Sequence, residues 1–219
     1  MSFDYIRDPE EITRRSFEEI LNTADFTGIP DPLLAVAVRL VHACALPEII
    51  PNLAWSENAA ARGEAALKSG APVFCDARMV AEGIMRPRLP AENQVICTLN
   101  DPGIEALAKE NETTRSAQAI NLWADRLEGA IVAIGNAPTA LFRLLEIIDE
   151  GGGRPAVILG FPIGFIGAAE SKEALIIESK KRGLDYITLR GRFGGSALAA
   201  ASVNALARSA TEAATSGGQ

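Results

Sequence analysis

The stretch Ala130-Ile131-Val132-Ala133-Ile134-Gly135-Asn136-Ala137-Pro138-Thr139 joins a short apolar run to a glycine and then to a proline-led segment. Residues 130–134 are too few for a helix and rich in β-branched side chains, which predicts a strand buried on both faces. Residues 138–150 fit a helix that begins at a proline, a residue well tolerated in the first helical turn. A buried strand followed at once by a helix is the repeating unit of a parallel α/β sheet.

The same alternation extends along the chain in both directions. Four more apolar runs are predicted to be strands, at residues 72–75, 94–98, 156–159 and 185–189. Helices fit between or after them at residues 113–127, 169–181 and 196–207, and before them at about residues 9–24, 31–46 and 57–69. The sequence therefore predicts a three-layer α/β/α fold with a mainly parallel central sheet of about five strands, preceded by N-terminal helices.

Length and composition set the limits within which this fold must work. The 219 residues suit a single domain over residues 1–210, and the small polar residues at 211–219 are expected to form a flexible tail. Hydrophobic residues make up 48% of the chain but aromatic residues only 5%, which favours tightly packed helices on a buried sheet. A net charge of −7 argues against general nucleic-acid binding.

The cysteines and the chain start bear on the compartment and on metals. Three cysteines without a CxxC pair make a disulfide framework or a zinc site improbable and indicate a reducing compartment. The chain contains one histidine and no acidic cluster at ligand spacing, so no metal site is expected. No apolar run approaches the ~20 residues of a membrane span, and the first residues lack a secretory signal. We therefore expect a cytoplasmic protein without membrane contact.

Glycine and polar residues gather just after the predicted strands, where open α/β sheets bind their ligands. These segments are Cys75-Asp76, Gly135-Asn136-Ala137-Pro138-Thr139, residues 160–167 and residues 190–196. Any one of them is explained as well or better by a tight strand-to-helix turn, but together they favour a large, flat or bulky ligand. The glycine spacings match neither a dinucleotide fingerprint nor a P-loop, and no GxSxG motif occurs.

The single histidine, His42, is the side chain best suited to moving protons near neutral pH. On a helix, Arg39 and His42 lie three residues apart on one face, roughly opposite the apolar stripe. A plain surface helix that carries an Arg and a His fits the same residues. The small apolar neighbours Ala35, Val36 and Ala43 argue instead for a site or a subunit contact.

Arginines are the second chemical resource, because a guanidinium can grip a carboxylate with two hydrogen bonds. Arg115 is expected in the first turn of a helix, where a cation is out of place unless it meets an anion. For Arg86, Arg88 and Arg190 a surface ion pair is the simpler explanation.

Taken in order, the segments of this chain resemble the precorrin-8X methylmutase family of cobalamin biosynthesis. The resemblance spans nearly the whole chain and is carried by residues 4–9, 15–17, 38–44, 70–76, 95–99, 114–117, 135–141, 164–172 and 190–196. One departure is Met85, where the family often has threonine. This difference puts in doubt the substrate contacts of that loop but not the reaction.

The resemblance implies an isomerase that moves a methyl group from carbon 11 to carbon 12 of the precorrin-8X ring and yields hydrogenobyrinic acid. The shift is intramolecular, and the family works as a homodimer without a metal or organic cofactor. The family's catalytic histidine falls on His42, and its substrate contacts fall on Ser16, Arg39 and Arg115. We expect Asn136, Gly164 and Arg192, in the loops that follow strands, to bind substrate as well.

Three other interpretations stay open at this point. A cobalt-precorrin-8 methylmutase would share the same motifs. A non-catalytic tetrapyrrole carrier would use the same arginines and glycines but would not need a titratable His42. A nucleotide-dependent oxidoreductase is suggested only by the α/β pattern, and the missing fingerprint argues against it.

Overall fold

Six strands form one sheet in the order β1-β6-β5-β4-β2-β3 in the computed structural model, which describes residues 2–216. The strands are β1 (Leu53–Trp55), β2 (Val73–Cys75), β3 (Val95–Ile96), β4 (Ile131–Ile134), β5 (Val157–Gly160) and β6 (Tyr186–Leu189). The pairs among β2 to β6 are all parallel, and only β1 runs antiparallel, beside β6. This confirms the predicted α/β fold with a mainly parallel sheet.

The sheet holds one strand more than we predicted. The missed strand, β1, has three residues and lies at the edge, where Leu53 pairs with Leu189 and Trp55 with Ile187. A run this short, between Pro51 and a polar segment, has no recognisable periodicity. The three strands next to it, β6, β5 and β4, are buried at every position, and this burial gave the continuous apolar runs of the sequence.

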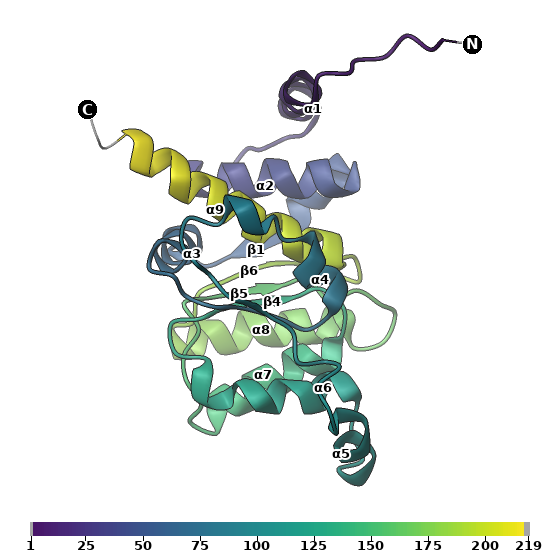
Figure 1. Ribbon diagram of the computed structural model, residues 1–219, viewed down its shortest axis with the longest axis vertical. Coiled ribbons are helices and arrows are strands. Elements are labelled where there is room, and N and C mark those ends of the chain that lie inside the picture. Colours follow the sequence, from purple (N-terminus) through teal and green to yellow (C-terminus); the bar gives the residue numbers. More distant parts are fainter. Residues whose placement is uncertain (1, 217–219) are drawn as a thin grey trace.

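Helices cover both faces of the sheet (Figure 1). One face carries α2 (Asp31–Cys44), α3 (Ala59–Lys68), α4 (Arg78–Gly83) and α9 (Ser196–Ser216). The other face carries α6 (Arg115–Ile120), α7 (Pro138–Asp149) and α8 (Ala168–Arg182), with α5 (Ile104–Glu110) beyond α6. Each face has its own apolar core, built in the first case around α2, α3 and α9 and in the second around α7 and α8.

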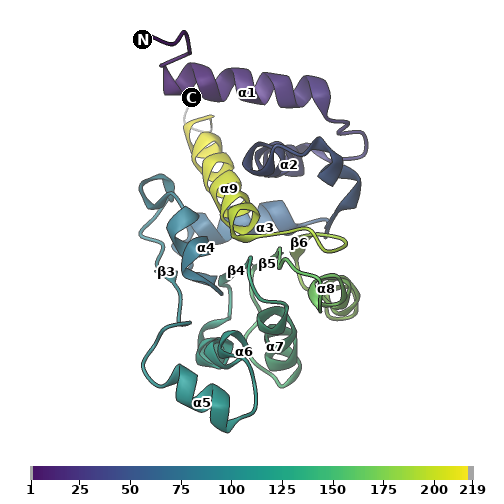
Figure 2. The same cartoon turned by 90° about the vertical axis from the view of Figure 1, so that its right-hand side faces the viewer.

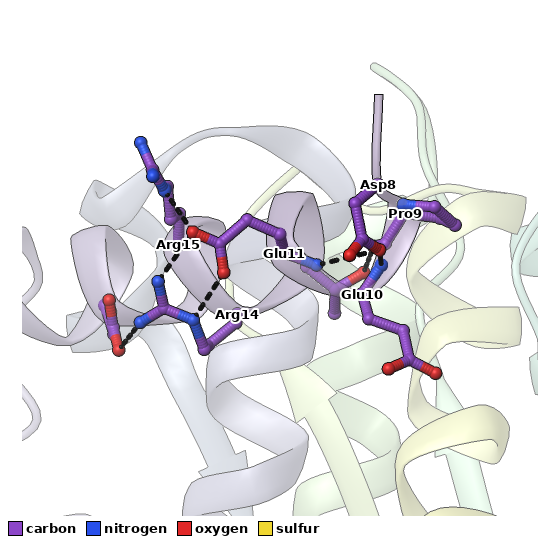
Figure 3. Close-up of polar contacts among 8 residues, drawn as sticks. Asp8, Pro9, Glu10, Glu11, Arg14 and Arg15 are labelled. Atoms are coloured by element: carbon purple, nitrogen blue, oxygen red, sulfur yellow. Dashed lines mark hydrogen bonds and ion pairs between the residues drawn. The ribbon is translucent and has the colours of Figure 1, made fainter. Parts of the chain in front are cut away.

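The first helix, α1 (Pro9–Thr23), lies outside these layers and packs against α2 (Figure 2). None of its residues is fully buried. The helix starts where Asp8 Oδ1 accepts a hydrogen bond of 2.9 Å from the backbone N–H of Glu10, a standard N-cap. Its first turns are tied by Glu11, whose carboxylate accepts from Arg14 at 2.7 Å and from Arg15 at 2.6 Å (Figure 3).

Several predicted helix limits differ from the structure. The helix expected at residues 113–127 is α6 followed by a 3₁₀-helix, η3 (Asn121–Arg126), and the short helices α4 and α5 were not predicted. The last helix, α9, continues to Ser216, so residues 211–216 extend it, and residues 217–219 of the expected tail lie outside the described part. The alanine-rich sequence of this end favours a helix, and Ala207 and Ala210 are buried. No helix within residues 2–216 is long and apolar enough to cross a membrane.

Candidate active site

The imidazole of His42 is held by two consecutive residues of α1. Ser16 Oγ lies 2.8 Å from His42 Nδ1. The ring of Phe17 meets the imidazole edge to face, with 5.3 Å between ring centroids and an interplanar angle of 77°. The two helices α1 and α2 therefore fix the orientation of the histidine and leave its Nε2 side as the one not engaged by Ser16.

α2 directs Arg39 and His42 away from the core, as the helical spacing predicted. Leu33, Ala37, Leu40 and Val41 form its buried face, whereas Arg39 is half-buried and His42 exposed. Ala35 and Ala43 are exposed beside them, but Val36 is buried in the core. The expectation of three small apolar residues around the charged pair therefore holds for the two alanines only.

The surroundings of His42 favour its neutral form. Although His42 is exposed, the side chains around it shield its imidazole from part of the solvent; this partial desolvation lowers the pKa of His42 below its ordinary value, and the nearby charge of Arg39 lowers it further. Because Ser16 carries a hydroxyl, it can accept a hydrogen bond from Nδ1–H in both the neutral and the charged imidazole. An anion placed close to this site would oppose the effect of Arg39 and raise the pKa of His42.

Arg39 belongs to a cluster of three arginines with Arg88 and Arg208. Burial lowers the pKa of Arg39, and the like charges of Arg88 and then Arg208 lower it further. Among the described residues, no carboxylate forms an ion pair with Arg39, whose Nη2 donates instead to Met85 Sδ at 3.7 Å. A half-buried guanidinium with cations around it and only a thioether as acceptor is poised for an anionic ligand.

A cavity of about 1100 Å³ opens between α1, the segment of residues 87–90 and α9. Its walls carry apolar side chains and more cations than acids: Phe17, Leu21 and Leu89, the arginines Arg14, Arg39, Arg88 and Arg208, and the acids Glu10 and Glu18. A second cavity of about 310 Å³ shares Phe17, Leu21, Arg39 and Arg208 with it. His42 does not line either of these two cavities, but Arg39, three residues away on the same helix, lines both.

The glycine-rich loops form a separate rim at the carboxyl ends of the strands and do not line these two cavities. The buried carboxylate of Asp76 accepts hydrogen bonds from the backbone N–H groups of Gly135, Asn136 and Ala137, at 2.9, 3.0 and 2.8 Å. Burial raises the pKa of Asp76, and these three donors oppose the rise. Asp76 thus fixes the loop that presents Asn136.

Gly164 and Arg192, from two different rim loops, lie together. The Gly164 N–H donates to the Arg192 carbonyl oxygen at 3.3 Å. The Arg192 guanidinium carbon lies 5.6 Å from the ring centroid of Phe165. Gly164 has a φ of +149°, a backbone conformation that other residues rarely adopt. The rim thus joins two of the predicted substrate contacts, but in a part of the chain distinct from the Arg39 cluster.

Arg115 lies far from this cluster within one chain. It begins α6, which covers the face of the sheet opposite to α2 (Figures 1 and 2). Its Nη2 donates to Asn100 Oδ1 at 3.1 Å, and it lines a different cavity of about 550 Å³ together with Asp101 and Lys109. A single chain therefore brings Ser16, Arg39 and His42 together but leaves Arg115 apart.

Little in the sequence marks Arg88 and Arg208 as members of the arginine cluster. For Arg86 and Arg190 the expected surface ion pairs exist, with Glu82 at 3.6 Å and with Glu173 at 2.6 Å. The surface ion pair expected for Arg88 is absent, because no described carboxylate forms an ion pair with it. Arg208 lies 5.7 Å from the ring centroid of Phe17, a contact that only the folding of α9 onto α1 creates. The described residues hold no group of three His, Cys, Asp or Glu side chains suited to a metal ion.

Comparison with known proteins identifies the family. The family model described as precorrin-8X methylmutase matches residues 11–209. The chain is 57% identical to a precorrin-8X methylmutase from Pseudomonas aeruginosa over 93% of this chain and 97% of that protein. It is 52% identical to one from Sinorhizobium sp., over 94% of this chain and 97% of that protein.

More distant relatives also match over most of the chain. A cobalt-precorrin-8 methylmutase from Methanocaldococcus jannaschii is 33% identical over 90% of this chain and 88% of that protein. The crystal structure of a precorrin-8X methylmutase from Thermus thermophilus superposes with a TM-score of 0.85 at 36% identity, covering 93% of this chain and 97% of that one. The chain therefore belongs to the precorrin-8X methylmutase family.

Proposed function

We propose that this chain is an isomerase that moves a methyl group from C-11 to C-12 of precorrin-8X and so forms hydrogenobyrinic acid. The two relatives named for precorrin-8X are much more similar to it than the relative named for the cobalt-containing substrate. This difference favours the metal-free ring over the cobalt form. The Ser16–His42 pair beside an arginine cluster is the observation that carries the proposal.

His42 lends a proton to the ring and takes it back. The imidazolium donates from Nε2 to the conjugated ring, which selects the arrangement of double bonds that the shift needs. The bond from C-11 to the methyl group then breaks as the bond to C-12 forms, and the ring returns the proton to Nε2. Ser16 accepts from Nδ1–H throughout, which keeps Nε2 free to carry the proton. General acid–base help of this kind is typically worth ~10²–10⁴-fold.

The arginine cluster and the cavity beside it suit a large polyacid. Arg39, Arg88 and Arg208 supply cations for the substrate carboxylates, and Phe17, Leu21 and Leu89 supply apolar surface for the ring. A volume of about 1100 Å³ lies just above the usual range of small-ligand sites, which ends at about 1000 Å³. Because the shift is intramolecular, the proposal needs neither a methyl donor nor a cofactor. We expect the enzyme to work in the cytoplasm.

A homodimer accounts for the remaining substrate contacts. Arg115 and His42 lie on opposite sides of the sheet, so each substrate would meet α2 of one chain and α6 of another. Exposed apolar side chains support a subunit contact, with Phe165 85% and Ile166 89% exposed. In this dimer Asn136, Gly164 and Arg192 would complete the rim around the substrate.

The reaction is tested by adding trace protein to excess precorrin-8X and following the ring absorbance. An enzyme converts all of the substrate, whereas a carrier changes the spectrum only in proportion to its own amount. His42→Ala is expected to lose at least ~10²-fold in turnover while still binding product. Full turnover by this variant would remove the role of His42, and faster turnover of cobalt-precorrin-8 would identify that ring as the substrate.

The shared site is tested by mixing two inactive variants, His42→Ala and Arg115→Ala. Random exchange of subunits makes half of the dimers mixed, each with one intact and one doubly altered site. Activity should then return to about a quarter of the wild-type value. No recovery in a mixture shown to exchange subunits would mean that each chain carries a complete site.

A further inference from the structure

Lys172, in the first turns of α8, is a lysine with no exposed surface. Its Nζ donates a hydrogen bond of 2.6 Å to the carbonyl oxygen of Phe193, the one hydrogen bond of this ammonium among the described residues. Lysines are almost never fully buried unless they are paired with an acid. The position of this side chain therefore needs an explanation.

No acidic side chain balances this ammonium within the described part of the chain. On its own helix, Glu170 is exposed, and Glu173 is engaged by Arg190 at 2.6 Å. The loop that Lys172 contacts carries only the cations Arg190 and Arg192. Burial lowers the pKa of Lys172 to about 8, and no neighbouring charge opposes this effect. The ammonium is thus a buried positive charge without a partner charge.

The Phe193 carbonyl that accepts from Lys172 belongs to the loop of residues 190–195. The backbone of this loop is hydrogen-bonded to the backbone of the loop of residues 161–167. The Gly195 N–H donates to the Phe161 carbonyl oxygen at 2.7 Å, and the Gly164 N–H donates to the Arg192 carbonyl oxygen at 3.3 Å. A Cβ atom at Gly194 would collide with the carbonyl oxygens of Phe161 and Pro162. Lys172 adds a third link between the two loops. It lies on α8, the helix that follows the loop of Phe161 and Gly164, and it donates to Phe193, which precedes Gly194 in the other loop.

Stability alone does not account for a lysine here. A buried, uncompensated charge is destabilising, and an apolar side chain of similar length is often as stable or more so. The ammonium group of Lys172 must therefore serve a purpose other than stability. The residue next to Phe193 is Arg192, which is exposed and is a proposed contact for the anionic substrate.

We propose that Lys172 is a positioning residue that holds the Phe193 carbonyl and thereby sets Arg192 and Gly164 in the geometry that binds the carboxylates of the substrate. The proposal rests on the proposed function, because it assumes that these two loops contact the substrate. The buried cation also adds a positive field beneath the rim, which an anionic substrate neutralises. The effect of Lys172 is on binding, because the proton transfer belongs to His42.

Lys172→Met tests the proposal, because methionine keeps the length of the side chain and removes its charge and its donor. We expect KM for precorrin-8X to rise about tenfold, kcat to stay within about twofold, and the melting temperature to be unchanged or higher. Lys180→Met, an exposed position on the same helix, is the matched control and should leave all three values unchanged. If the wild type and Lys180→Met both turn over precorrin-8X, the proposed function holds whatever the result for Lys172→Met. Failure of the Lys172 proposal is therefore distinguishable from failure of the proposed function.

A double-mutant cycle with Arg192→Met shows whether Lys172 acts through Arg192. If it does, Lys172→Met raises KM much less in the Arg192→Met background than in the wild type. Equal effects in both backgrounds, or a lower melting temperature with unchanged KM, would overturn the proposal. Should Lys172→Met not fold, Lys172→Leu also removes both the donor and the charge and is subject to the same criteria.

Discussion

Ser16 Oγ lies 2.8 Å from Nδ1 of His42, and the two residues belong to different helices, α1 and α2. The imidazole therefore depends on α1 for its orientation and on α2 for its position. No residue of α1 is fully buried, and this contact joins the packing of Ile20 against the core in fastening the helix to the rest of the protein.

Replacing Ser16 by alanine should weaken catalysis without abolishing it. The imidazole keeps its contact with Phe17 but loses the acceptor that holds the proton on Nδ1. We expect kcat to fall about fivefold, the usual net worth of one neutral hydrogen bond, with KM little changed. Steady-state kinetics test this, with Thr23→Ala at the exposed end of α1 as the control. A wild-type kcat in Ser16→Ala would show that the hydroxyl does not support the histidine.

Replacing Arg39 by methionine should weaken substrate binding without weakening the fold. Arg39 has no carboxylate partner among the described residues and lies close to Arg88 and Arg208, so its removal relieves repulsion between like charges. We expect KM to rise about tenfold or more, and the melting temperature to stay the same or rise. Arg62→Met, an exposed position on α3, is the control. A lower melting temperature with unchanged KM would assign Arg39 a purely structural role.

The pH dependence of catalysis should reveal the lowered pKa of His42. The imidazolium is the proposed proton donor, so kcat/KM should rise as the pH falls through the pKa of the free enzyme. Burial and Arg39 place this pKa below the ordinary value of 6.5, and the change should therefore be centred below pH 6.5. In the complex the substrate carboxylates favour the imidazolium, which moves the corresponding limb of kcat to higher pH.

The same measurement on Arg39→Met separates the two causes. Removal of the Arg39 charge should move the kcat/KM limb to higher pH, while the part of the shift that burial causes remains. A limb above pH 6.5 in the wild type, or one that Arg39→Met does not move, would contradict the electrostatic account of His42.

Replacing Asp76 by asparagine should lower stability. Both carboxylate oxygens accept backbone N–H groups, and an amide offers one oxygen and places an NH₂ group against the other donors. We expect a loss of about 1–3 kcal/mol in the free energy of unfolding, measured by denaturant titration. Asp101→Asn, in an exposed loop, is the control. Unchanged stability in Asp76→Asn would mean that the loop of Asn136 is held by other contacts.

The sequence predicted the elements that are regular and buried. β4 and β5 are buried at every residue, and such strands appear as continuous apolar runs between turn signals. The elements that were missed are short: β1 has three residues and α5 seven, too few for a period to repeat. The break between α6 and η3 has no proline or glycine to mark it.

For the site, helical spacing alone put Arg39 and His42 on one face of α2. Ser16 was expected only from the family resemblance, because nothing in the sequence of α1 marks one serine as a partner for a residue 26 positions away. Arg88 and Arg208 join Arg39 only through the tertiary fold. The glycine-rich loops, where we expected a large ligand to bind, do not line the two cavities beside Arg39, whose walls come from other segments.

The placement of α1 outside the core has a consequence for how the protein fails on heating. A helix that buries none of its residues completely can detach while the sheet and its covering helices stay intact. Detachment would strip His42 of its hydroxyl partner and open one wall of the large cavity. Catalytic competence would then disappear at temperatures where circular dichroism still reports a nearly native secondary structure, and bound substrate would delay that loss.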